Sequence, residues 1–173
     1  MGKIKASVLS SIAALLVQPL IFLAWMGIPA LAAGETVAFF DMARFSPLVA
    51  VFAIPFVVIV GVPAALLLSR DRALRWAPLA LVGTVAAILP LLAIIPGGGT
   101  GDSSGGNWHG QVVDYVVNGK PTLYGWLSYL ESLLYFGLPG LIGASVFYAV
   151  WRRSMGPNSS FKPNLLRSSK SVA

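Results

Sequence analysis

Four long uncharged, apolar runs constrain this chain more than any other feature of its sequence. They cover residues 6–34, 45–69, 76–101 and 132–151, and the last run extends upstream past Glu131 to residue 124. A helix needs roughly 20 apolar residues to cross the ~30 Å hydrocarbon core of a bilayer. Only 10% of the residues are charged, whereas soluble domains carry about 25%. The sequence therefore predicts an all-α integral membrane protein whose main partner is the lipid bilayer.

We expect a four-span helix bundle within residues 1–153, with spans near residues 8–30, 47–69, 76–96 and 124–151. A short external loop at residues 34–46 joins the first two spans, and a basic turn at residues 70–75 joins the next two. Residues 97–123 form a long outer loop. Residues 154–173 are polar, basic and without periodicity, which predicts a disordered cytoplasmic tail.

The basic residues are distributed unevenly along this topology. Ten of the twelve lie at one set of predicted helix ends, namely Lys3, Lys5, Arg70, Arg72, Arg75, Arg152, Arg153, Lys162, Arg167 and Lys170. Cytoplasmic loops of membrane proteins carry such an excess of Lys and Arg. The pattern predicts that both termini are cytoplasmic and favours a bacterial inner (plasma) membrane. Because topology accounts for the positive charge, we expect no nucleic-acid partner.

A second interpretation of the first span stays open. Lys3 and Lys5 precede an apolar run that ends near Ala30-Leu31-Ala32, which resembles a secretory signal with its cleavage site. In that case residues 1–32 would be removed and three spans would remain. The apolar run covers residues 8–30, longer than the roughly 7–15 residues of a signal's apolar region. The length favours an uncleaved transmembrane helix.

The outer loop divides into two parts. Residues 97–106 are almost entirely Gly, Ser and Thr, which predicts a flexible linker. Residues 111–124 contain two strand-like stretches around Asn118-Gly119, the pair that favours a two-residue hairpin turn. Pro121 weakens the second strand because proline cannot donate to the ladder. A short β-hairpin and an irregular loop with one tight turn are both consistent with this segment.

The chain offers few groups for catalysis or metal binding. It has one histidine, His109, and no cysteine, whereas zinc and other transition metals usually need three or four ligands. No nucleophile–histidine–acid set surrounds His109. We therefore expect no enzyme activity, cofactor or metal. The candidate interaction residues of the outer loop are Trp108, His109, Asp114 and Tyr115.

Glu131 is the one charged residue inside an otherwise apolar span. The helical rise places it roughly 8–10 Å below the outer interface. Carboxylates at such positions face a bundle interior, a partner or water. Ser128 and Tyr135 share its helical stripe, and Gln18 is a polar partner from the first span. Glu131 could bind a proton or cation, contact a partner subunit, or form structural hydrogen bonds near the headgroups.

Small residues mark the opposite side of the last span. Gly137, Gly140, Gly143 and Ala144 cluster there, and such faces let helix backbones approach closely. We interpret them as a packing face only.

These observations favour a non-catalytic function over an enzyme. We expect an accessory or partner-binding subunit of a membrane or envelope assembly, with a protein partner or a homo-oligomer. The alternative is a small oligomeric transporter or channel that uses Glu131 in a proton or cation pathway.

Overall fold

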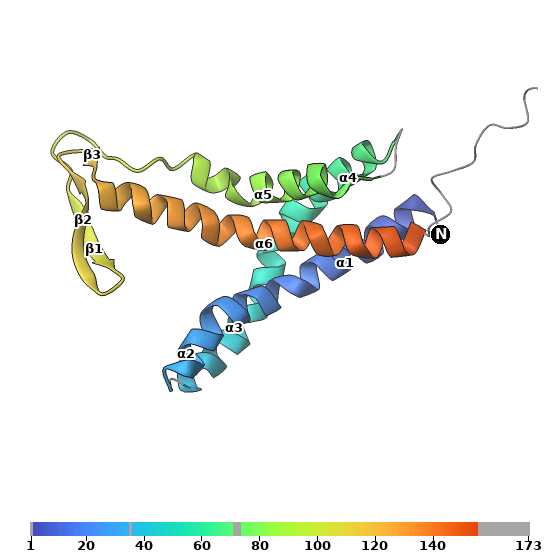
Figure 1. Cartoon of the computed structure of the whole chain (residues 1–173), viewed down its shortest axis with the longest axis horizontal. Coiled ribbons are helices and arrows are strands. Elements are labelled where there is room, and N and C mark those ends of the chain that lie inside the picture. Colours follow the sequence, from blue (N-terminus) through green and yellow to red (C-terminus); the bar gives the residue numbers. More distant parts are fainter. Residues whose placement is uncertain (1, 35, 71–73, 156–173) are drawn as a thin grey trace, which may run out of the picture.

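The computed structural model describes residues 2–34, 36–70 and 74–155. Most of the predicted tail, residues 156–173, lies outside the described residues. The chain is mainly helical and carries one small sheet (Figure 1). Its elements are α1 (Lys3–Phe22), the π-helical η1 (Leu23–Gly27), α2 (Ile28–Ala32), α3 (Thr36–Pro55), the π-helical η2 (Phe56–Gly61), α4 (Val62–Leu68), α5 (Trp76–Leu92), β1 (Ser104–Trp108), β2 (Gln111–Val117), β3 (Lys120–Pro121) and α6 (Leu123–Met155).

Among the described residues, three continuous helices are long and apolar enough to cross a membrane. They are Lys3–Ala32, Thr36–Leu68 and Leu123–Met155. The fourth predicted span corresponds to α5, which is apolar but has only 17 residues. It ends at Leu92, so residues 93–96 of the prediction are not helical. The membrane class of the sequence prediction therefore agrees with the helices, while the fourth span stays a prediction because α5 is shorter.

The predicted external loop at residues 34–46 is wrong. Helix α3 begins at Thr36, and Gly34, with a φ of +83°, is part of the tight connection before it. Two of the three charged residues in this segment lie on this helix. Asp41 and Arg44 are exposed and lie one turn apart, with 3.8 Å between their charged groups. Charge in this segment reflects an exposed helix surface and not a break in the helix.

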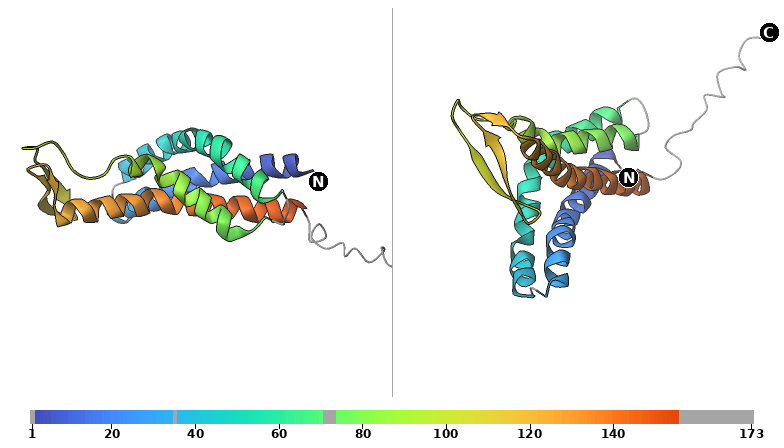
Figure 2. Two further views of the ribbon diagram at one scale, coloured as in Figure 1. Left: turned by 90° about the horizontal axis from the view of Figure 1, so that it is seen from above. Right: turned by 60° about the vertical axis from the view of Figure 1, so that its left-hand side comes forward.

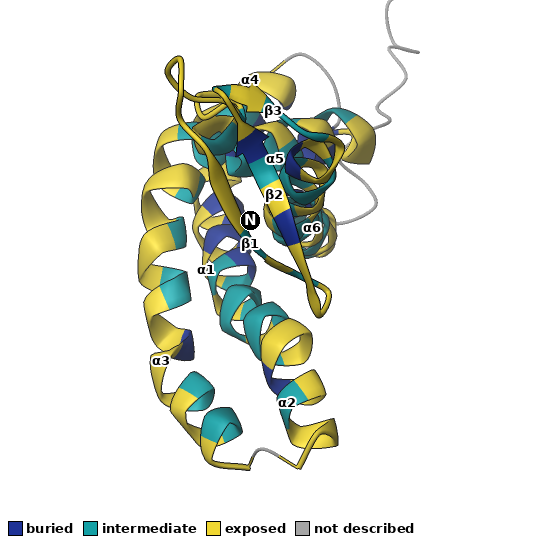
Figure 3. Ribbon diagram, turned by 90° about the vertical axis from the view of Figure 1, so that its left-hand side faces the viewer, coloured by how far each residue is buried: buried dark blue, intermediate teal, exposed yellow. Residues whose placement is uncertain are grey.

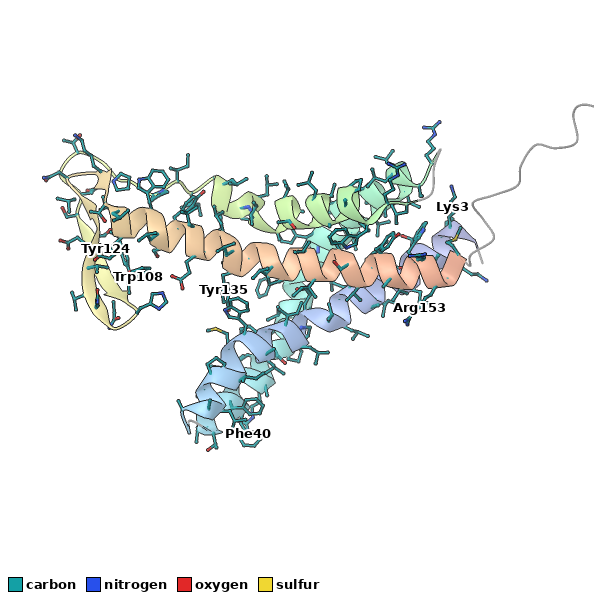
Figure 4. The ribbon with its side chains drawn as sticks, in the orientation of Figure 1. Lys3, Phe40, Trp108, Tyr124, Tyr135 and Arg153 are labelled. Carbon is teal, nitrogen blue, oxygen red and sulfur yellow. The ribbon has the colours of Figure 1, made fainter. Side chains whose placement is uncertain are left out.

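The N-terminal end of α1, the end of α4 and the C-terminal end of α6 lie at the same end of the molecule. Lys3 Nζ donates a 2.8 Å hydrogen bond to the carbonyl oxygen of Ser69, just after α4. Lys3 and Arg153 lie at this end in Figure 4, whereas the sheet residues Trp108 and Tyr124 lie at the other. We call these the basic end and the sheet end. Lys3 and Arg153 thus lie away from the sheet.

Small residues bring the backbones of helices α5 and α6 into direct contact. A Cβ atom on Gly83 would lie 2.8 Å from the carbonyl oxygen of Gly140 and 2.7 Å from the Cβ of Ala144. A Cβ on Gly140 would lie 2.6 Å from the Cβ of Ala87. The spacing Gly140-x-x-x-Ala144 therefore meets Gly83-x-x-x-Ala87. This contact confirms that the glycine face of the last span is a packing face.

The buried core lies near the basic end. Ala6, Ala14, Ala65, Leu74, Leu79, Phe147 and Trp151 form one buried cluster. Most other large apolar side chains are exposed, above all along α3, where Phe52 is 74% exposed (Figure 3). Soluble proteins rarely expose such a continuous apolar surface. The distribution fits helices whose outer faces contact lipid.

The helix formed by α1, η1 and α2 and the helix α3 diverge from α5 and α6 towards the sheet end (Figure 2). Each of the two diverging helices contains a π-helical segment that ends before a proline. Ile28 donates its N–H five residues back to Leu23, and Pro29 follows; Val62 donates to Val57, and Pro63 follows. Proline removes the regular donor, so the neighbouring hydrogen bonds shift register.

Candidate functional site

A three-stranded antiparallel sheet at the sheet end contains the candidate residues of the outer loop. Its order is β1-β2-β3. Asn118 and Gly119, with φ values of 51° and 77°, form the turn between β2 and β3. This confirms the hairpin and rules out the irregular loop. Strand β3 has only two residues and ends at Pro121, as expected for a residue that cannot donate to a ladder.

The flexible linker predicted at residues 97–106 is wrong for its second half. Residues 104–108 form β1, which pairs with β2. A second two-residue turn joins them, with φ values of 50° at His109 and 85° at Gly110. The ring of Tyr115 lies against Gly106, where a Cβ would come within 2.9 Å of it. Glycine therefore leaves room for an aromatic ring here, which composition alone does not reveal.

The first half of the predicted linker is also held by hydrogen bonds. Gly98 N–H donates to the carbonyl oxygen of Gly119 at 3.1 Å, and Gly119 N–H donates to that of Asp102 at 2.7 Å. The carboxylate of Asp102 accepts the N–H of Gly99 at 2.7 Å. The glycine-rich segment thus packs on the Asn118-Gly119 turn instead of forming a free linker.

The sheet is anchored to the start of α6. Thr122 precedes the helix, and its hydroxyl accepts the N–H of Gly125 at 3.2 Å, as an N-cap residue does. The same hydroxyl donates to the carbonyl oxygen of Asp114 on β2 at 2.5 Å. A side chain at Gly125 would collide with the carbonyl oxygen of Tyr115. Close backbone contact therefore joins strand and helix here.

Glu131 forms the second anchor, six residues after Gly125 on α6. Trp108 Nε1 donates a 2.9 Å hydrogen bond to Glu131 Oε2. His109 Nε2 lies 3.3 Å from Glu131 Oε1, an ion pair whenever the imidazole carries a proton. The Trp108 ring also packs edge-on against Tyr124, with 5.5 Å between ring centroids. Both carboxylate oxygens are therefore engaged by the tip of the β1–β2 hairpin.

The other three predicted partners of Glu131 lie elsewhere. The Ser128 carbonyl oxygen accepts the hydroxyl of Ser132 within α6. Tyr135 packs edge-on against Trp25, with 5.8 Å between centroids. Gln18 Nε2 donates to the carbonyl oxygens of Pro139 and Ala14 at 3.3 and 3.4 Å. Gln18 thus joins two helices as expected of an interhelical amide, but its partner is backbone.

The four predicted interaction residues of the outer loop also separate into two groups. Trp108 and His109 turn towards Glu131, and the Tyr115 hydroxyl donates to the carbonyl oxygen of Asn107 at 3.1 Å. Asp114 is exposed on β2. Val112, which the sequence did not single out, is 90% exposed on the same strand. The outward surface of the sheet is therefore centred on Val112 and Asp114.

The contacts of Trp108 and His109 with Glu131 are suited to holding the sheet on α6. The exposed face of the sheet around Val112 is suited to contacting another molecule. Within residues 2–34, 36–70 and 74–155, no three His, Cys, Asp or Glu side chains are close enough to bind a metal ion together. The half-exposed Glu131 faces an indole and an imidazole at the surface. The sequence did carry a signal for the contact of Glu131 with Trp108 and His109. An aromatic and an imidazole side chain stand next to each other in the outer loop, and Glu131 is the one carboxylate of the following span.

Comparisons with known proteins add no relative to this description, since no family model, curated protein or solved structure matches the chain.

Proposed function

We propose that this chain is a non-catalytic, four-span inner-membrane protein that binds a partner protein of an envelope assembly through its outer sheet. The observation that carries the proposal is the anchoring of the sheet. Two contacts, at Gly125 and at Glu131, hold it on α6. Its β2 strand then presents Val112 at 90% exposure. A fixed sheet with an outward apolar side chain supports recognition by another protein.

The topology of the proposal follows from charge and helix length. Lys3, Ser69 and Arg153 lie at the basic end, which we assign to the cytoplasm by the positive-inside rule. Helix α5, with 17 residues, is roughly 26 Å long at the α-helical rise. That length is near the lower limit for a span, so α5 crosses with little tilt or beside a locally thinner bilayer.

The alternative is an oligomeric transporter or channel that uses Glu131 in a proton or cation pathway. Its support is weaker, because Trp108 and His109 engage both carboxylate oxygens near the surface. A group in a pathway through the bundle would instead face its interior. Proton or cation flux in reconstituted vesicles that disappears on Glu131→Gln would favour this alternative.

Site-specific photo-cross-linking tests the proposal. A photoreactive amino acid at position 112 should give one discrete adduct with a protein partner in native membranes. The same amino acid at the exposed helix position Val58 should not give that adduct. An adduct of the chain with itself would indicate a homo-oligomer. The absence of any protein adduct from position 112 in folded protein would contradict the proposal.

A further inference from the structure

A half-enclosed cavity lies between the two diverging pairs of helices. Its volume is about 660 Å³, within the range of roughly 300–1,000 Å³ found for sites that hold small organic molecules. Its walls come from α1 and η1, from α3 and η2, from α5 and from α6. The cavity therefore occupies the middle of the bundle, where the predicted spans lie within the apolar part of a membrane.

The lining of the cavity is apolar. Among the described residues that form it, only Gln18, Trp25 and Tyr135 carry a polar side-chain atom. The amide nitrogen of Gln18 is already bonded to the carbonyl oxygen of Pro139 on α6. A cavity of this kind gives water too few hydrogen-bond partners and does not retain it. Its natural contents inside a bilayer are hydrocarbon.

The dimensions distinguish a lipid chain from a protein helix. The lining of α5 runs from Leu79 to Leu91, a length of roughly 18 Å at the helical rise. One leaflet contributes about half of the ~30 Å hydrocarbon core, which is close to this length. A partner helix would have to cross the whole core, which is about twice this length.

The shape of the walls supports the same occupant. Helix α3 packs on α1, α1 also packs on α6, and α5 and α6 pack on each other. The helices form a wedge that widens towards the sheet end (Figure 1), and their facing sides line the cavity. The π-helical η2 forms part of this wedge, and its Gly61 contributes no side chain to it. A single narrow chain can enter such a wedge from the surrounding bilayer.

We propose that this cavity binds one acyl chain of a membrane phospholipid as a resident ligand between the helix pairs. The lipid fills the space that the diverging α1 and α3 leave beside α5 and α6. This site is separate from the outer sheet, because its lining does not include a residue of β1, β2 or β3.

Native mass spectrometry of the full chain tests the proposal. The protein is reconstituted in vesicles of palmitoyl-oleoyl phosphatidylethanolamine and phosphatidylglycerol and then extracted and washed in mild detergent. The wild-type chain should retain one phospholipid. Gly61→Phe should lose it, because a Cβ at Gly61 meets only the Phe56 carbonyl oxygen, 3.8 Å away, so the ring can enter the cavity. Ala53→Phe, from another wall residue, should act in the same way.

Two variants serve as matched controls. Gly61→Ala changes the same backbone position without filling the cavity, and it should retain the lipid. Val58→Phe places a ring on the exposed side of η2, 54% exposed in the wild type, and should retain it too. Helical circular dichroism checks that each variant is folded. A folded wild type without lipid, or a folded Gly61→Phe and Ala53→Phe with wild-type lipid, would overturn the proposal. A different apolar compound in protein taken from native membranes would also overturn it.

Discussion

The α5–α6 pair and the α1–α3 pair are both antiparallel, yet they pack in opposite ways. In the first pair, Gly83 and Gly140 bring two backbones into contact. In the second pair, large apolar side chains point outwards, and only 6% of the most apolar window of α3–α4 is buried. Small residues let helix backbones approach closely in a membrane, whereas bulky side chains keep them apart.

The difference extends to what each pair supports. The sheet is connected to α5 on one side and to α6 on the other, and its anchors at Gly125 and Glu131 both lie on α6. The diverging α1 and α3 instead form the outer walls of an apolar cavity. We therefore regard α5–α6 as the frame of the protein and α3 as its most exposed apolar helix.

The largest expected effect comes from a substitution that disrupts the contact between α5 and α6. Gly140→Leu should destabilise the fold by about 3 kcal/mol or more, because overpacking against backbone cannot relax easily. The atoms in the way are the Gly83 carbonyl oxygen and the Ala87 Cβ, 2.5 and 2.6 Å from an added Cβ. Reversible unfolding in mixed micelles measures the loss. Gly61→Leu, in the loosely packed pair, is the matched control and should cost far less. Equal losses would contradict the comparison.

The next effect concerns the turns of the sheet. Gly119→Ala should lower the stability of the sheet by about 2 kcal/mol, from left-handed backbone strain plus a steric clash. A Cβ there would lie 2.5 Å from the Gly99 carbonyl oxygen. Gly110→Ala has a similar φ, +85°, but open space around it, so it should cost about 1 kcal/mol from strain alone. Hydrogen exchange of the β2 amides measures both. A larger effect at Gly110 would contradict the packing of the glycine-rich loop.

Loss of the anchor at Glu131 should have a moderate effect confined to the sheet. Glu131→Ala removes the acceptor of Trp108 and the partner of His109. Because the carboxylate is half exposed, we expect a cost of about 1 kcal/mol. Amide exchange should accelerate in residues 104–117 and stay unchanged in α1 and α3. Ser132→Ala, which removes a hydroxyl bonded only within α6, should leave the sheet protected. Unchanged exchange in Glu131→Ala would show that the anchor is dispensable.

The smallest effect tests the contact between the two pairs. Gln18→Leu removes a 3.3 Å hydrogen bond to the Pro139 carbonyl oxygen. Interhelical hydrogen bonds in membranes contribute about 0.6 kcal/mol on average, and this one is long. Unfolding in mixed micelles should therefore detect a loss well below that of Gly140→Leu. A loss as large as that of Gly140→Leu would place the main helix contact at α1 instead of α5.

Local patterns in the sequence predicted the parts of the fold that depend on local chemistry. Apolar runs gave the long helices, the Asn118-Gly119 pair gave the hairpin, and Gly140-x-x-x-Ala144 gave a packing face. Glycine at position 106 suggested flexibility, whereas the ring of Tyr115 packs against it within the paired strands β1 and β2. That outcome depends on a residue distant along the chain, so composition could not show it.

The candidate site was predicted only in part for the same reason. Glu131 was identified from its charge, but its partners were sought on its own helical face and on the first span. The actual partners, Trp108 and His109, reach it because a second turn folds β1 back over α6. That turn has no Asn-Gly pair and uses His109 in the left-handed region, which only a few per cent of non-glycine residues adopt.

Cysteine accessibility in intact cells tests the central claim, that the sheet end and the basic end lie on opposite sides of a membrane crossed four times. The chain has no native cysteine, so single substitutions report individual positions. A membrane-impermeant maleimide should label Val112→Cys and Gly34→Cys in intact cells. It should label Ser69→Cys and Arg153→Cys only after permeabilisation. Labelling of Val112→Cys and Arg153→Cys from the same side would contradict the account.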